Sequence, residues 1–208
     1  MHMGLRDLFR RTPPIRAPHE LGQFIDERAA FVVQKGIYEY SRARAGHYAK
    51  VLFAEPEFLQ AVEVSRWRAY PLGLAMVGEV ASGVLHPHSG ADRIGALAAL
   101  NALVLTVFDR YPEPAILADG EWREARAELA HRLQLIGMHP PKRVIDIPEP
   151  LAESYFDLMP IHEKLRGRDF PTMHSYLKIV LCNVHDDLTK RLDAPALLES
   201  LCGDRSDG

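Results

Sequence analysis

Apolar residues recur along most of this chain at intervals of three and four, the spacing that places side chains on one face of an α-helix. From about His19 to Ala45 this spacing predicts a long first helix. A second helical segment begins near Pro56, because proline is favoured in the first turn of a helix. Proline inside a helix removes one backbone hydrogen bond and crowds the preceding turn, so we expect Pro71 to kink or split this second segment.

Further helices follow in the second half of the chain. The stretch Ile94–Phe108 is almost wholly apolar, which is typical of a helix surrounded by other elements. An amphipathic helix is predicted over about 121–136, another from about Pro150, and a last one over about 172–191. The fold class that this pattern predicts is all-α, an irregular multi-helix bundle around the apolar helix Ile94–Phe108.

The helical pattern also predicts the domain organisation, one helical domain with a segment at each end. Residues 18–193 form one predicted helical domain, and residues 194–208 form a C-terminal tail that we expect to be partly disordered. Residues 1–17 form a basic segment broken by two prolines, which we expect to be mobile. This segment either binds nothing or lies on an anionic membrane surface, since its leucines, phenylalanine and arginines can form an amphipathic turn.

Composition and charge narrow the classes of partner. The 208 residues include 25 basic and 28 acidic side chains, and the net charge of -3 gives no general attraction to a phosphate backbone. Nucleic acid is therefore not an expected partner. The two cysteines, Cys182 and Cys202, form neither a disulfide framework nor a paired metal spacing, which favours a reducing compartment and the cytoplasm as the location.

Chemistry-bearing motifs are sparse. Glu128 and His131 have the spacing of a carboxylate and an imidazole in di-iron bundles, but such a site needs two copies and further glutamates. The pair also lies off the inward stripe around Leu129, so we expect no metal site. The chain has no nucleophile elbow and no phosphate-binding loop, and we expect no catalytic residue and no cofactor.

One histidine lies on a predicted apolar face. His162 shares helical spacing with four apolar residues, Leu151, Tyr155, Leu158 and Leu165. It is a candidate for binding a small molecule or cofactor in a pocket between helices. The alternative is a core histidine whose hydrogen bonds are satisfied within the protein.

Two clusters combine arginine with aromatic side chains, the types that dominate protein interfaces. The candidate partner-binding residues are Tyr40, Arg44 and Tyr48 in the first cluster and Arg66, Trp67 and Arg68 in the second. The alternative is that the arginines pair locally, as Glu39 with Arg42 and Glu63 with Arg66, while the rings belong to the core.

A run of short motifs in residues 141–185 resembles the ubiquinol-cytochrome c chaperone family. The matching residues are Pro141–Val144, Leu151–Phe156, His162–Leu165, Gly167–Asp169 and Asn183 with Val184. The resemblance implies a helical assembly factor, a non-enzymatic helper that binds a respiratory-chain subunit or its assembly machinery near a membrane. The basic segment 1–17 would then provide a peripheral membrane contact.

Two functional hypotheses follow. The first is a non-enzymatic, chaperone-like assembly factor that binds another protein through its arginine and aromatic side chains. The second is a helical enzyme that binds a small molecule or cofactor in an interhelical pocket near His162.

Overall fold

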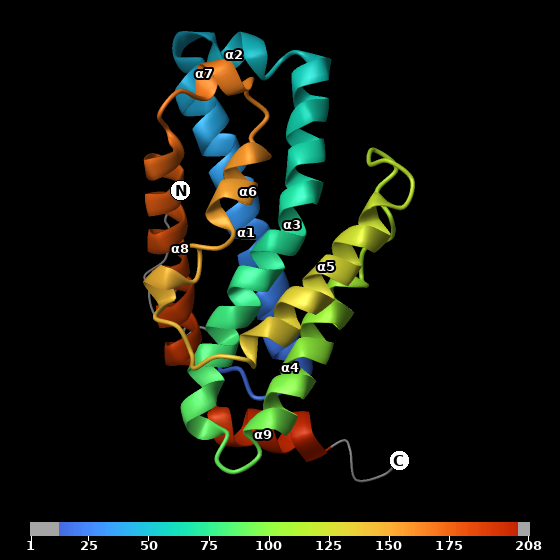
Figure 1. The fold of residues 1–208 in the computed structure, drawn as a ribbon, viewed down its shortest axis with the longest axis vertical. Coiled ribbons are helices and arrows are strands. Elements are labelled where there is room, and N and C mark those ends of the chain that lie inside the picture. The colour runs from blue at the N-terminus through green and yellow to red at the C-terminus, as the bar shows by residue number, and fades with distance from the viewer. Residues whose placement is uncertain (1–12, 204–208) are drawn as a thin grey trace, which may run out of the picture.

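A computed structural model shows an all-α bundle and confirms the predicted fold class (Figure 1). The structure describes residues 13–203, and it contains no β-strand within them. The helices are α1 Pro18–Ala45, α2 Ala49–Leu52, α3 Pro56–Leu85, α4 Arg93–Phe108, α5 Glu121–Ile136, α6 Ala152–Asp157, α7 Glu163–Arg166, α8 Phe170–Arg191 and α9 Ala194–Gly203, and short 3-10 turns lie at Gly46–Tyr48, His86–His88 and Val144–Asp146. None of the helices in this described part is long and apolar enough to span a lipid bilayer.

The start of α1 follows from local chemistry. Pro18 occupies the first turn, where its missing N–H is not needed by the helix. The carboxylate of Glu20 accepts hydrogen bonds from the backbone N–H groups of Arg16 and Ala17, at 2.7 and 3.0 Å. These contacts satisfy donors at the helix start that have no partner inside the helix, so the chain turns into α1 at the predicted place.

The helix at the centre of the bundle is α3. It packs against α1, α4, α5 and α8, and Figure 1 shows it running between them. The predicted central helix Ile94–Phe108 corresponds to α4 and lies at the side, where Ile94 is 86% exposed and the buried residues gather on the inner face. The prediction of the central helix was wrong because apolar residues also occupy the solvent side of α4, where Ile94, Ala98 and Ala102 are exposed.

Two residues in α3 shape its path. The helix is continuous through Pro71, so the predicted split does not occur, and Figure 1 shows α3 changing direction near its middle. Gly73 lets α3 approach α1 closely: a Cβ atom there would lie 2.9 Å from Val33 Cγ2 and 3.1 Å from the carbonyl oxygen of Ala29. The absence of a side chain at this position therefore sets the distance between the two helices.

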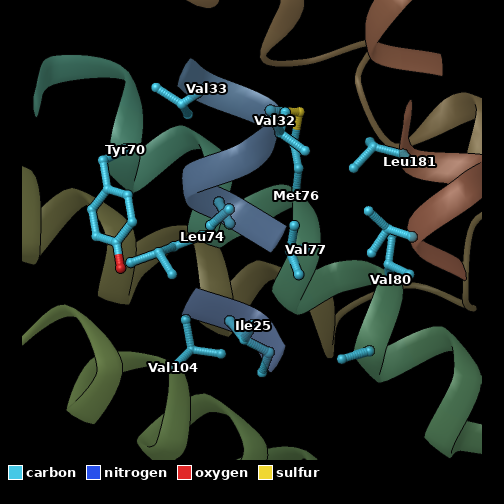
Figure 2. Close-up of a cluster of buried hydrophobic side chains, with 14 of the residues drawn as sticks. Ile25, Val32, Val33, Tyr70, Leu74, Met76, Val77, Val80, Val104 and Leu181 are labelled. Carbon is cyan, nitrogen blue, oxygen red and sulfur yellow. The ribbon is translucent and has the colours of Figure 1, made fainter. Parts of the chain in front are cut away.

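The core is shared by helices that are distant in the sequence. Figure 2 shows apolar side chains from four helices facing one another. They are Ile25, Val32 and Val33 of α1, Leu74, Met76, Val77 and Val80 of α3, Val104 of α4 and Leu181 of α8. Burial of this contiguous set is the main stabilising contribution to the bundle.

The ends of the described chain belong to the domain. Ile15 is fully buried and forms an isolated parallel β-bridge with Leu192, the residue after α8. Its N–H donates to the carbonyl of Arg191 at 2.8 Å, and its carbonyl accepts from the N–H of Asp193 at 2.9 Å. Beyond it, α9 packs on α4 and buries Leu197 completely. The domain therefore extends beyond the boundaries predicted at residues 18 and 193, to include Ile15 and α9. Residues 1–12 and 204–208 of the two predicted end segments lie outside the described residues.

The burial of α9 gives a stability prediction. Leu197→Ala removes a fully buried side chain, and we expect it to lower the free energy of unfolding by about 2–4 kcal/mol. Glu199→Ala changes an exposed residue of the same helix, and its effect should stay within about 0.5 kcal/mol. Urea unfolding of both variants checks this; equal stabilities would show that α9 contributes nothing to the fold.

Candidate functional site

A groove of about 530 Å³ lies between the middle of α1 and the first half of α3. Each wall is one stripe of a helix. The α1 wall consists of Phe31, Gln34, Lys35 and Tyr38, and the α3 wall consists of Leu59, Val62, Glu63 and Arg66. Both stripes have the spacing i, i+3, i+4, i+7, so each helix presents to the groove the face that it would present to a third helix.

Large apolar side chains on both walls of the groove are half-exposed. Phe31, Tyr38 and Leu59 are each between 42 and 46% exposed, although large apolar side chains are usually covered. The ring of Phe53 closes one end, since it packs against Tyr38 with ring centroids 4.7 Å apart. Half-exposed apolar side chains that lie together in a groove are typical of surfaces that bind another molecule.

Charges of both signs line the groove. Lys35 and Glu39 lie on α1, and Glu63 and Arg66 lie on α3. None of the four forms an ion pair with another side chain in residues 13–203. The predicted local pair of Glu63 with Arg66 is therefore not formed, and these charges are available to a partner.

The first predicted cluster is divided between interior and surface. Tyr40 is buried, and its hydroxyl donates a hydrogen bond to Asp169 Oδ2 at 3.0 Å. Arg44 Nε forms an ion pair with the same oxygen at 3.1 Å. Desolvation, together with the hydrogen bond to Asp169 and its charge, raises the pKa of Tyr40 to about 12. Tyr40 and Arg44 thus attach Asp169, the residue before α8, to α1, whereas Tyr48 is 76% exposed.

The second cluster is divided in the same way. Trp67 packs edge-on against the rings of Tyr111 and Trp122, with centroids 5.7 and 5.6 Å away. The guanidinium of Arg68 donates two hydrogen bonds to Glu121, at 2.6 and 3.1 Å. Both residues connect α3 to neighbouring elements, and only Arg66 of this cluster lines the groove.

His162 does not lie on a buried helix face. The helix α6 ends at Asp157, and His162 is an exposed residue immediately before α7. Its Nδ1 accepts a hydrogen bond from the backbone N–H of Lys164 at 3.2 Å, so it caps that short helix. The predicted inward position was wrong because Pro160 breaks the periodicity between the two parts of the segment.

The metal-like pair is also at the surface. Glu128 and His131 are exposed, and Glu128 forms an ion pair with Arg132 at 2.8 Å. Across the described part of the chain, no three histidine, cysteine, aspartate or glutamate side chains gather in a way that could hold a metal ion.

Sequence reasoning missed most of the groove. Phe31, Lys35 and Leu59 lie outside the two predicted clusters of arginine and aromatic residues and were therefore not predicted. The sequence did contain one indication of the groove. Phe31 lies off the inward stripe that passes through Ala29 and Val32, and a large apolar residue away from that stripe indicates a second contact face on the helix.

Comparison with known proteins gives no relative. The chain matches no protein-family model, no curated protein and no solved structure. The resemblance in residues 141–185 therefore stays a prediction.

The different surroundings of Tyr40 and Tyr48 predict different effects of their substitution on stability. Tyr40→Phe removes a hydrogen bond to a charged group, and we expect a loss of about 1.5–3 kcal/mol in the free energy of unfolding at pH 7. Tyr48→Phe should change it by less than about 0.5 kcal/mol. Chemical denaturation distinguishes the two, and equal effects would contradict the structural assignment of Tyr40.

The raised pKa of Tyr40 adds a pH dependence. Its folded-state pKa of about 12 exceeds the ordinary value of 10.0, so the neutral form stabilises the fold. This contribution is fully present below pH 10 and is lost as the pH rises toward 12. The decline in stability over this window should be less steep in Tyr40→Phe than in the wild type.

Proposed function

We propose that this protein is a non-enzymatic, chaperone-like assembly factor that binds another protein, and that the groove between α1 and α3 is its docking site. The observation that supports this most is the pair of helical stripes, Phe31 to Tyr38 and Leu59 to Arg66, that face the groove with half-exposed apolar residues. Two adjacent helices that leave such stripes uncovered form a surface on which a third helix packs by ridges and grooves.

The occupant that fits is an amphipathic helix of the partner. Its apolar face would cover Phe31, Tyr38 and Leu59, as in other complexes in which a helix lies in a groove. Charged residues of both signs beside that face would pair with Lys35 and Glu63. The balanced charge of the groove favours a mixed sequence in the partner over a strongly basic or strongly acidic one.

The identity of the partner is a finer part of the proposal. The resemblance in residues 141–185 points to a respiratory-chain subunit or its assembly machinery, and a cytoplasmic protein working at the membrane surface would meet such a partner there. Residues 1–17 would assist through their basic side chains, which are attracted to anionic lipids. The net charge of -3 disfavours nucleic acid as a competing partner.

The alternative, an enzyme with a pocket at His162, has less support. The histidine is exposed, and its Nδ1 is engaged in capping α7. No described feature favours catalysis at that position.

The groove can be tested by placing a charge inside it. Leu59→Lys puts an ammonium group on the apolar α3 wall, and Ile179→Lys puts the same group on α8, where Ile179 is 64% exposed and outside the groove. We expect Leu59→Lys to reduce retrieval of the partner at least tenfold, which corresponds to about 1.4 kcal/mol. Ile179→Lys should behave as the wild type.

The measurement uses the tagged full-length chain and solubilised membranes of its host. Mass spectrometry quantifies the respiratory-chain subunits that each variant retrieves, and a synthetic helix of the retrieved subunit then gives the affinity directly. Equal retrieval by all three proteins would exclude the groove as the docking site. Loss of self-association alone in Leu59→Lys would instead identify the groove as an interface between two copies of this chain, and would contradict the proposal.

A further inference from the structure

One end of the molecule brings together two segments that are far apart in the sequence. The first contains the end of α1, the turn Gly46–Tyr48 and α2, and the second contains α7; Figure 1 shows both at the top of the molecule. They are in contact, because Arg44 pairs with Asp169 and a Cβ atom at Gly167 would lie 3.9 Å from the Arg44 guanidinium. We call residues 41–54 and 161–168 together the basic tip.

The basic tip is positively charged, although the whole chain has a net charge of -3. Residues 41–54 contain three arginines and lysines and no acidic residue, and residues 161–168 contain three against a single glutamate. Two of these six cations are engaged within the protein. Arg44 pairs with Asp169, and Arg166 donates to the backbone carbonyls of Phe156 and Ile161.

The other four cations face solvent. They are Arg42, Lys50, Lys164 and Arg168, all of them exposed. None of the four pairs with another side chain that the structure describes, so the predicted local pair of Glu39 with Arg42 is not formed. The basic tip therefore presents cations that an anionic surface would attract.

Apolar side chains protrude among these cations. Tyr48 is 76% exposed, Val51 is 60% exposed and Leu165 is 62% exposed. They belong to the turn after α1, to α2 and to α7, so both segments of the basic tip contribute. A protein partner binds by matching the shape of a surface, whereas the boundary of a lipid bilayer accommodates protruding side chains of any shape.

From this combination we propose that the basic tip binds the surface of a lipid bilayer that contains anionic phospholipids. The exposed cations pair with lipid phosphates, while Val51 and Leu165 reach the boundary between headgroups and acyl chains. The ring of Tyr48, with an apolar body and a polar hydroxyl, suits the same boundary. Nucleic acid would satisfy the cations but not the protruding aliphatic side chains.

The basic tip is distinct from the other candidate surfaces. None of its exposed cations or protruding apolar residues lines the groove between α1 and α3, so the inference does not rest on the proposed function. It is also separate in sequence from the basic segment 1–17, for which a membrane contact is predicted above. The experiments below leave both of those regions unchanged.

The first test is co-sedimentation of the full-length protein with lipid vesicles. One set of vesicles consists of phosphatidylcholine alone, and the other of equal parts of phosphatidylcholine and phosphatidylglycerol. We expect saturable binding to the anionic vesicles and binding weaker by about tenfold or more to the neutral ones. Added salt should weaken the binding to anionic vesicles, because ions screen the exposed cations.

A matched pair of charge variants locates the contact. Lys50→Gln with Arg168→Gln removes two cations from the basic tip, and Lys190→Gln with Arg93→Gln removes two exposed cations from the end of α8 and the start of α4, in the lower half of Figure 1. Each cation near an anionic bilayer strengthens binding about fivefold, so the tip variant should bind about twentyfold more weakly. The control variant has the same net charge and should bind as the wild type does.

A second pair tests the apolar contact at constant charge. Val51→Ser with Leu165→Ser shortens two protruding side chains of the basic tip, and Ile94→Ser with Ile179→Ser does the same at exposed positions of α4 and α8. We expect the tip variant to lose binding by about tenfold or more, since less apolar surface enters the bilayer, and the control to be unaffected. All four positions are exposed, so thermal melting should remain cooperative in both variants.

Several outcomes would overturn the proposal. They are absence of wild-type binding to anionic vesicles, equal binding to both kinds of vesicle, and equal losses in the tip and control variants. Normal binding by both tip variants, with loss only when residues 1–17 are removed, would assign the membrane contact to that segment instead. Binding of single-stranded RNA but not of vesicles, lost in the charge variant, would make the basic tip a nucleic-acid surface and would also contradict the proposal.

Discussion

The close contact between α1 and α3 is the constraint on which the rest of the structure depends. It is possible because Gly73 has no side chain to separate α3 from Ala29 and Val33. The other side of α1 is equally tight, since a Cβ atom at Gly36 would collide with the hydroxyl of Tyr155. The backbone of α1 is thus held between α3 on one side and the aromatic residues of α6 and α8 on the other.

Tyrosine hydroxyls complete this arrangement. Those of Tyr155 and Tyr176 both donate to the carbonyl of Val32, at 3.1 and 3.0 Å, and so attach α6 and α8 to the same turn of α1. Burial raises the pKa of both tyrosines, which keeps the hydroxyls protonated and able to donate. The contacts therefore fix the position of α1, which forms one wall of the proposed docking groove.

The sequence predicts the long helices well because their stripes are local. The periodicity of residues within one helix does not depend on the rest of the chain, and the segments 121–136 and 172–191 match α5 and α8 closely. The central position of α3 could not be predicted in this way. Both α3 and α4 pack against four helices, but α4, although more uniformly apolar, leaves one side exposed at Ile94.

The candidate site was harder to predict for a related reason. Tyr40 and Arg44 find their partner in Asp169, and Arg68 finds its partner in Glu121, so the ionic contacts cross long distances in the sequence. Residue type alone therefore could not separate Tyr40, which is structural, from Tyr48, which is exposed. Phe31 lies off the inward stripe in the sequence, but the fact that it shares a groove with Leu59 depends on how α1 and α3 are placed in space.

The bridge between Ile15 and Leu192 has a consequence for the order of folding. It encloses almost the whole domain in one loop, together with the ion pair of Arg16 with Asp193 at 3.0 Å. Closing so long a loop has a high entropic cost until the intervening helices have collapsed. The contacts between α1 and α3 join residues much nearer in sequence, so we expect them to form before the bridge and residues 13–17 to pack onto the bundle last.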